Sequence, residues 1–145
     1  MTFSPAFEKG HVEVGHTRDS KVPFKIYYEK TGNGPNKILL VMGLNTPGSA
    51  WEPVVNYFAT KPEYTTLIFD NRGVGFSDTP KGLYSTSQMA HDTIELLDQV
   101  GWKNDVHLVG VSMGGMISLE LFLADPKRFC SLVLTSTNAG RSPPQ

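Results

Sequence analysis

The chain has 145 residues, close to the length of one average domain, and its 13 basic and 14 acidic side chains leave a net charge of −1. This balance excludes a basic nucleic-acid arm, a polybasic membrane surface and an acidic tail. The longest apolar run, residues 38–44, is far shorter than the roughly 18 residues that span a membrane, and the first residues lack the basic and apolar regions of a secretory signal. We therefore expect a soluble, cytoplasmic protein with no membrane span.

Hydrophobic periodicity predicts the following elements in chain order: strands at 11–16, 22–29 and 37–42, a helix at 49–60, a strand at 64–69, a helix at 87–100, a strand at 106–111, a helix at 115–124 and a strand at 131–135. The first two strands alternate apolar and polar residues, as an antiparallel hairpin does. The later strands are apolar on both faces and alternate with helices. This order predicts an α/β fold, a mostly parallel sheet with helices on both faces and the hairpin at its edge. One domain over 1–145 is expected, with flexible ends at 1–9 and 139–145.

Local signals indicate two helix boundaries. Ser49 and Glu52 have the spacing of a capping box, and Pro53 follows in the first turn, where proline does least damage. These residues predict the start of the helix at 49–60. The helix at 87–100 carries an apolar stripe and stops before Gly101, a residue typical of helix C-termini.

The motif that carries chemistry is Gly110-Val111-Ser112-Met113-Gly114, which matches G-x-S-x-G between a predicted buried strand and a predicted apolar helix. A serine on so sharp a turn brings strand and helix close together, and Gly110 and Gly114 leave room where side chains would collide. We expect a strained serine backbone that projects the hydroxyl into solvent. The N–H of Met113 then points to where an oxyanion would form. The alternative is an ordinary serine in a glycine-rich turn.

Two further segments accompany this motif. Residues 41–44, Val-Met-Gly-Leu, follow a predicted buried strand, and residues 70–78 read Asp-Asn-Arg-Gly-Val-Gly-Phe-Ser-Asp. With the serine motif they resemble, in order, the oxyanion segment, the D-x-R-G-x-G-x-S loop and the nucleophile elbow of the α/β-hydrolase family (AB hydrolase-1 type), in its esterase, lipase and C–C hydrolase branch. The resemblance implies these site residues: Ser112 as nucleophile, Met113 and Leu44 (or Asn45) as oxyanion N–H donors, and Gly43, Gly110, Gly114, Gly115, Asp70 and Arg72 as supports of the elbow and loop.

A serine at position 112 implies acyl-enzyme chemistry on a small-molecule carboxylic ester or related acyl bond, without cofactor or metal. It disfavours epoxide hydrolases and haloalkane dehalogenases, in which this family has an aspartate there. Nucleotide sites are disfavoured too, because no phosphate-binding P-loop is present and Gly73-Val74-Gly75 does not open a helix directly.

A serine hydroxyl needs a base, and the base needs an orienting acid. The family supplies them after the serine, in the order acid then histidine. All four histidines here precede Ser112: His11, His16, His91 and His107. We expect His107 to lie in the sheet away from the serine, His91 on a helix surface, and His11 and His16 to be exposed. The fold is thus predicted to be incomplete, without the family's cap and last strands.

For several other residues a purely structural role is considered as well as a functional one. Cys130 is expected to be a small buried side chain, because one cysteine makes no internal disulfide. Asp78 and Asp92 are expected to be loop and helix-surface charges. Trp51 and Phe76 either line an acyl pocket or simply contribute to the core.

Three functional readings remain open. The chain is the N-terminal portion of a serine hydrolase, or a non-catalytic relative that binds a ligand or partner, or a subunit whose base comes from a second chain. The strand at 131–135 should be an apolar edge, which favours self-association and marginal stability of the isolated chain; its oligomeric state is not predicted.

Overall fold

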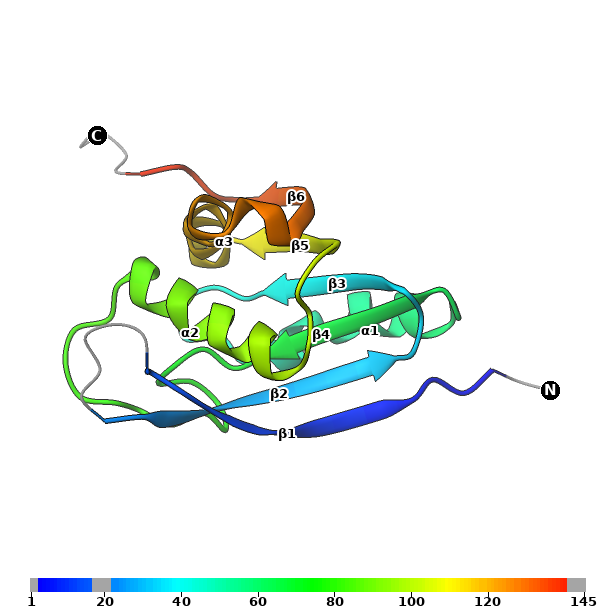
Figure 1. The fold of residues 1–145 in the computed structure, drawn as a ribbon, viewed down its shortest axis with the longest axis horizontal. Helices are drawn as coiled ribbons and strands as arrows, with labels where there is room; N and C mark the ends of the chain where they lie inside the picture. Colours follow the sequence, from blue (N-terminus) through cyan, green and yellow to red (C-terminus); the bar gives the residue numbers. More distant parts are fainter. Residues whose placement is uncertain (1–2, 17–21, 141–145) are drawn as a thin grey trace.

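The computed structural model of the protein describes residues 3–16 and 22–140 (Figure 1). The strands and helices are β1 (Phe7–Val14), β2 (Phe24–Gly32), β3 (Asn36–Val41), η1 (Gly48–Trp51), α1 (Glu52–Ala59), β4 (Tyr64–Phe69), α2 (Thr86–Gln99), β5 (Val106–Val111), α3 (Met113–Ala124), η2 (Pro126–Arg128) and β6 (Phe129–Thr135). None of the helices in these ranges combines the length and the apolar character that crossing a bilayer requires.

The described strands form one mixed sheet of six strands in the order β1-β2-β4-β3-β5-β6. β1 pairs with β2, and β2 with β4, in antiparallel register, whereas β3 pairs with β4 and β5, and β5 with β6, in parallel register. The predicted α/β fold with an N-terminal antiparallel hairpin at the sheet edge is thereby confirmed. Within the described residues, β6 is the opposite edge.

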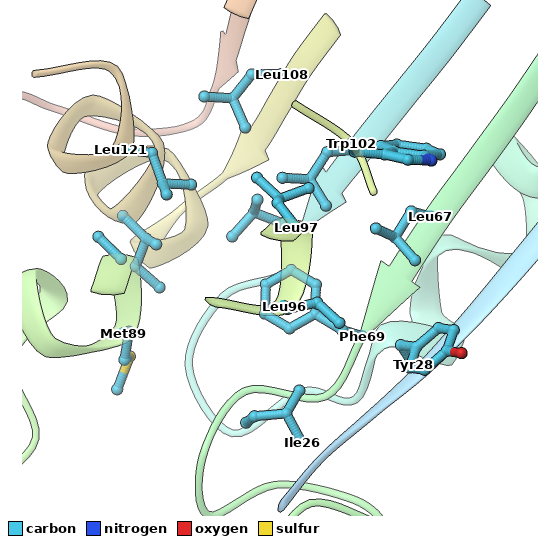
Figure 2. Packing of buried hydrophobic residues seen from close by; sticks show 14 of the residues in the cluster. Ile26, Tyr28, Leu67, Phe69, Met89, Leu96, Leu97, Trp102, Leu108 and Leu121 are labelled. Carbon is cyan, nitrogen blue, oxygen red and sulfur yellow. The ribbon is translucent and has the colours of Figure 1, made fainter. Parts of the chain in front are cut away.

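Helices cover both faces of the sheet, because its central strands are apolar on both sides. Along β3, Leu39 and Val41 belong to the core under α2 and α3, whereas Ile38 and Leu40 belong to a second core on the side of α1. Figure 1 shows α2 and α3 on the near face and α1 behind. In the larger core, side chains of α2 such as Leu97 lie over strand residues (Figure 2).

Boundaries differ from the predictions at both the first strand and the first long helix. β1 begins at Phe7, so part of the segment expected to be flexible, 1–9, is strand; most of the expected C-terminal end lies outside the described residues. The predicted capping box at Ser49 is wrong. Residues 48–51 form the 3₁₀ turn η1, and α1 begins after Trp51 with no side-chain cap.

The capping box is found instead at the start of α2. The hydroxyl of Ser85 accepts from the backbone N–H of Gln88 at 3.0 Å, and the Gln88 side chain accepts from the backbone N–H of Ser85, also at 3.0 Å. The two side chains thereby each accept a hydrogen bond from a backbone N–H group at the N-terminus of α2.

Candidate active site

Ser112 is the single residue between the end of β5 and the start of α3. Its backbone has φ 54° and ψ −126°, a conformation that L-residues with side chains rarely adopt. The residue is exposed, and its hydroxyl forms no hydrogen bond with any residue in the described ranges. The sharp turn expected at this serine is present, with the side chain open to solvent.

Two glycines allow the strand and the helix to approach at this turn. A Cβ on Gly110 would lie 2.4 Å from both the carbonyl oxygen of Gly114 and the hydroxyl of Ser118. A Cβ on Gly114 would lie 2.2 Å from the carbonyl oxygen of Val41, at the end of the neighbouring strand. These distances are shorter than any Cβ contact, so glycine is required at both positions for steric reasons.

The backbone N–H and carbonyl of Ser112 form three hydrogen bonds with other residues. The N–H of Ser112 donates to the carbonyl of Thr135, at the end of β6, at 3.1 Å. The carbonyl of Ser112 accepts from the N–H of Gly115 at 2.9 Å and from the hydroxyl of Thr137 at 2.7 Å. The end of β6 and the residues just beyond it therefore fix the orientation of the turn, and no local sequence pattern predicts this contact.

The segment after β3 lies directly against the serine. A Cβ on Gly43 would be 3.2 Å from the Cβ of Ser112 and 3.6 Å from the backbone nitrogen of Met113. Met113 is the first residue of α3, so its N–H has no acceptor within the helix. Leu44 follows with an exposed side chain, and Asn45 has φ 50°. The two N–H groups assigned to oxyanion binding stay predictions, although their segments are adjacent.

Asp70 organises the loop at 70–78 from its interior. Its carboxylate is buried and accepts from the backbone N–H of Gly48 at 2.8 Å and from that of Phe76 at 2.9 Å. The hydroxyl of Ser77 donates to the Asp70 carbonyl at 2.6 Å and accepts from the N–H of Tyr27 at 2.9 Å. Asp70 therefore ties the loop to η1 and has no oxygen directed at Ser112.

Arg72 forms a buried, two-pronged ion pair with Asp92 of α2. Its Nε and Nη2 atoms donate to the two carboxylate oxygens at 2.7 and 2.8 Å, and its guanidinium lies over the rings of Phe24 and Tyr84. Burial raises the pKa of Asp92, and the hydrogen bonds and charge of Arg72 oppose that shift. The expectation that Asp92 is a surface charge is wrong: its side chain faces the loop.

The four histidines lie apart from the serine. His11 and His16 are exposed, as expected, and His91 is half-buried on α2. The imidazole of His107 lies 2.6 Å (Nδ1) from the hydroxyl of Ser131 on the adjacent strand. No hydrogen bond joins a histidine to Ser112 among the residues that the structure describes.

Cys130 is exposed, which corrects the expectation of a buried thiol. Its sulfur lies 3.5 Å from Nδ1 of His107. The residue is the second of the edge strand β6, whose outer side has no neighbouring strand among the described residues. The position of Cys130 on this edge strand is consistent with its exposure.

A hollow of about 380 Å³ lies between α1 and the N-terminal hairpin, and an adjoining one of about 300 Å³ lies between the strands β2 and β4 and the loop at 70–78. Ser112 lines neither of them. Phe76 borders the smaller hollow, is 74% exposed and contacts the ring of Tyr27 edge-on. Trp51 is instead a buried member of the core on the side of α1. Of the two readings left open for these residues, core packing holds for Trp51.

The sheet order, the strained serine between strand and helix, and the glycines around it define one class of protein. A family model described as the alpha/beta hydrolase fold matches residues 36–145. The chain belongs to this family.

Similar proteins include several hydrolases. RutD of Azorhizobium caulinodans, whose name assigns it as a carbamate hydrolase, is 34% identical over 111 residues, which are 77% of this chain and 40% of that protein. The 3-oxoadipate enol-lactonase 2 of Acinetobacter baylyi is 35% identical over 66% of this chain and 35% of its own length. The solved structure of a thermophilic esterase from Thermogutta terrifontis superposes with a TM-score of 0.84 at 25% identity, over 93% of this chain and 48% of that one. The chain therefore spans less than half the length of these relatives.

Proposed function

We propose that the protein is a serine hydrolase that cleaves a carboxylic ester or a related acyl bond, with Ser112 as its nucleophile. The observation that carries the proposal is the positive φ of Ser112 at an exposed strand–helix junction. Strained conformations of this kind persist where the surrounding structure enforces them, and they cluster at active sites. The names of the esterase and enol-lactonase relatives support an acyl substrate.

The geometry supports the following sequence of reaction steps. The Ser112 oxygen attacks the substrate carbonyl carbon while a base removes its proton. The N–H groups of Met113 and Leu44 donate to the negative oxygen of the tetrahedral intermediate. The carbon–oxygen bond to the alcohol breaks, the alcohol takes the proton, and an acyl-serine remains. Water then attacks the acyl group and releases the carboxylic acid.

We place the base and its orienting acid outside residues 1–145. Two observations support this placement: His11 and His107 form hydrogen bonds with Phe76 and Ser131 and not with Ser112, and the chain covers only 40% of its RutD relative. In the family the acid and the histidine follow the serine along the chain.

A fluorophosphonate probe tests the proposal, because it phosphonylates activated serines. Applied to the native gene product in cell extract, it should label a peptide that contains Ser112. Ser112→Ala should abolish this labelling and hydrolysis of short-chain nitrophenyl esters, while Ser49→Ala, at an exposed serine of η1, and His107→Ala should leave both intact. Absence of labelling from the native product would contradict the proposal.

The intact mass of that product separates the proposal from the non-catalytic alternative. A labelled product much heavier than 16.0 kDa supports a serine hydrolase whose base and acid lie further along the chain. An unlabelled product of 16.0 kDa would favour a protein that binds a ligand or a partner instead. A labelled product of that mass would indicate a base supplied by a second chain.

A further inference from the structure

The carbonyl of Met42 is the first one beyond the ladder of β3, which ends at Val41. The side-chain amide of Asn71 reaches this carbonyl, and its Nδ2 donates to the Met42 oxygen at 3.1 Å. Asn71 is 3% exposed and Met42 is half-buried, so the hydrogen bond is partly buried. A loop 29 residues further along the chain thus determines the orientation of the peptide that follows β3.

This peptide adjoins the nucleophile. It joins Met42 to Gly43, and a Cβ on Gly43 would lie 3.2 Å from the Cβ of Ser112. A Cβ on Gly114 would lie 2.8 Å from the same Met42 oxygen. Since a peptide unit is planar, fixing its carbonyl fixes its N–H and restricts the following peptide, which carries the N–H of Leu44.

Asn71 is itself immobilised on both sides. Asp70, the preceding residue, is bound through both carboxylate oxygens to backbone N–H groups. Arg72, the following residue, is bound through two nitrogens to Asp92. The carbonyl of Asn71 accepts from the N–H of Val74 at 3.1 Å. Buried charged hydrogen bonds on either side hold the amide in one place.

We propose that Asn71 is a positioning residue whose amide orients the Met42–Gly43 peptide so that the N–H of Leu44 points at the developing oxyanion. The inference rests on the proposed function and adds to it, because none of the assigned site residues explains how the segment after β3 is held. Donors fixed before the reaction need no rearrangement when charge develops, so the effect belongs to the transition state. Asp92 then acts indirectly on the position of Asn71, because it fixes Arg72, the next residue.

The test compares two leucine variants in the full native chain. Asn71→Leu removes the amide at nearly constant volume, and Asn104→Leu makes the same exchange at an exposed loop residue. For ester hydrolysis, Asn71→Leu should lower kcat about 10- to 100-fold while KM changes less than about twofold, as expected for a misplaced transition-state donor. Asn104→Leu should change neither. Unchanged kcat in folded Asn71→Leu, or a rise in KM alone, would overturn the proposal.

Hydrogen exchange gives a second readout that needs no activity. Peptides covering residues 42–45 should exchange their amide protons faster in Asn71→Leu than in the parent, while peptides from β1 and β2 stay unchanged. If Asn71→Leu does not fold, Asn71→Asp, which keeps the shape and loses the donor, takes its place in both measurements. Should the parent show no hydrolysis that depends on Ser112, the proposed function fails. Hydrogen exchange at 42–45 then still tests whether Asn71 holds the segment after β3, and unchanged exchange would reject that role.

Discussion

The turn at Ser112 is surrounded by glycines. Gly110 and Gly114 face each other across the turn, and Gly43 faces the serine from the adjacent strand end. Because the atoms closest to a Cβ on Gly114 are all backbone atoms, which cannot turn aside as side chains do, this position has little tolerance for added volume.

Gly114→Ala should therefore destabilise the protein, although alanine ordinarily favours a helix. Its methyl group would lie 2.2 Å from the carbonyl oxygen of Val41, and we expect a loss of about 2 kcal/mol or more from the free energy of unfolding. Urea unfolding followed by circular dichroism measures the loss. Gly140→Ala, at a position with open space around it, is the control and should change little. A Gly114→Ala protein as stable as the parent would show that the strand and helix ends can separate.

Tyr28 should make stability fall in alkaline solution. Burial and the hydrogen bond that it donates to Glu8 raise the pKa of Tyr28 to about 12, above the ordinary value of 10.0. Below pH 10 both states keep the phenol proton. Between about pH 10 and about pH 12 only the unfolded state loses it, so the free energy of unfolding decreases as pH rises through this range.

Urea unfolding at about pH 9 and about pH 11.5 tests the effect across the window in which the two states differ. Tyr28→Phe should lose less stability between the two values than the parent, whereas Tyr57→Phe, at an exposed ring, should lose as much as the parent. Part of the fall should remain in Tyr28→Phe, because the pKa of Tyr27 is also raised to about 12, by burial and by Glu29. An identical fall in the parent and in Tyr28→Phe would contradict the assignment.

At the scale of elements, the sequence patterns predict the bounds of two central strands, whereas the cap predicted for one helix is wrong. β4 and β5 have the predicted bounds, because strands covered on both faces are continuous apolar runs. The local pattern S-x-x-E predicts a capping box at Ser49, and the structure has the capping box at Ser85. Which of two similar patterns caps a helix depends on how the preceding loop enters, and that is decided by contacts distant in the sequence.

Ser85 and Ser49 therefore form a matched pair of substitutions. Ser85→Ala removes the acceptor for the N–H of Gln88 and should cost about 1 kcal/mol. Ser49→Ala removes a hydroxyl that makes no cap and should change stability by less than about 0.5 kcal/mol. The midpoints of urea unfolding measure both. Equal losses in the two variants would mean that the cap of α2 contributes nothing specific.

Asp92 links α2 to the loop at 70–78 and should be one of the most sensitive positions. Asp92→Asn leaves the guanidinium of Arg72 buried without its anion, which should cost about 3 kcal/mol or more. Asp105→Asn, at an exposed residue, should be nearly neutral. The double variant Arg72→Met with Asp92→Leu should recover part of the loss, because no unpaired charge then remains. A double variant less stable than Asp92→Asn would argue against desolvation as the cause.

At the scale of the whole molecule, the class of fold and the strained turn at Ser112 could be predicted from the sequence, but the connections of the site could not. The alternation of strands and helices predicts a sheet covered by helices on both faces, and the spacing of Gly110 and Gly114 predicts the sharp turn at Ser112. The contacts of Ser112 with Thr135 and Thr137, and that of Asn71 with Met42, join segments far apart in the chain. Nothing in a local pattern encodes such pairs, and the buried ion pair of Asp92 with Arg72 is another of them.

The edge strand β6 should govern the association state of the isolated chain. Its outer side is unpaired within the described residues, and Val133 and Leu134 are 52% and 39% exposed. An apolar edge with free backbone groups favours pairing with another chain. Sedimentation velocity should show the mass of the 1–145 chain rising with concentration. A lysine on an edge strand opposes pairing, so Val133→Lys should reduce this rise, whereas Leu83→Lys, in an exposed loop, should not. A parent that stays monomeric at all concentrations and unfolds in one cooperative transition would show that this edge is protected.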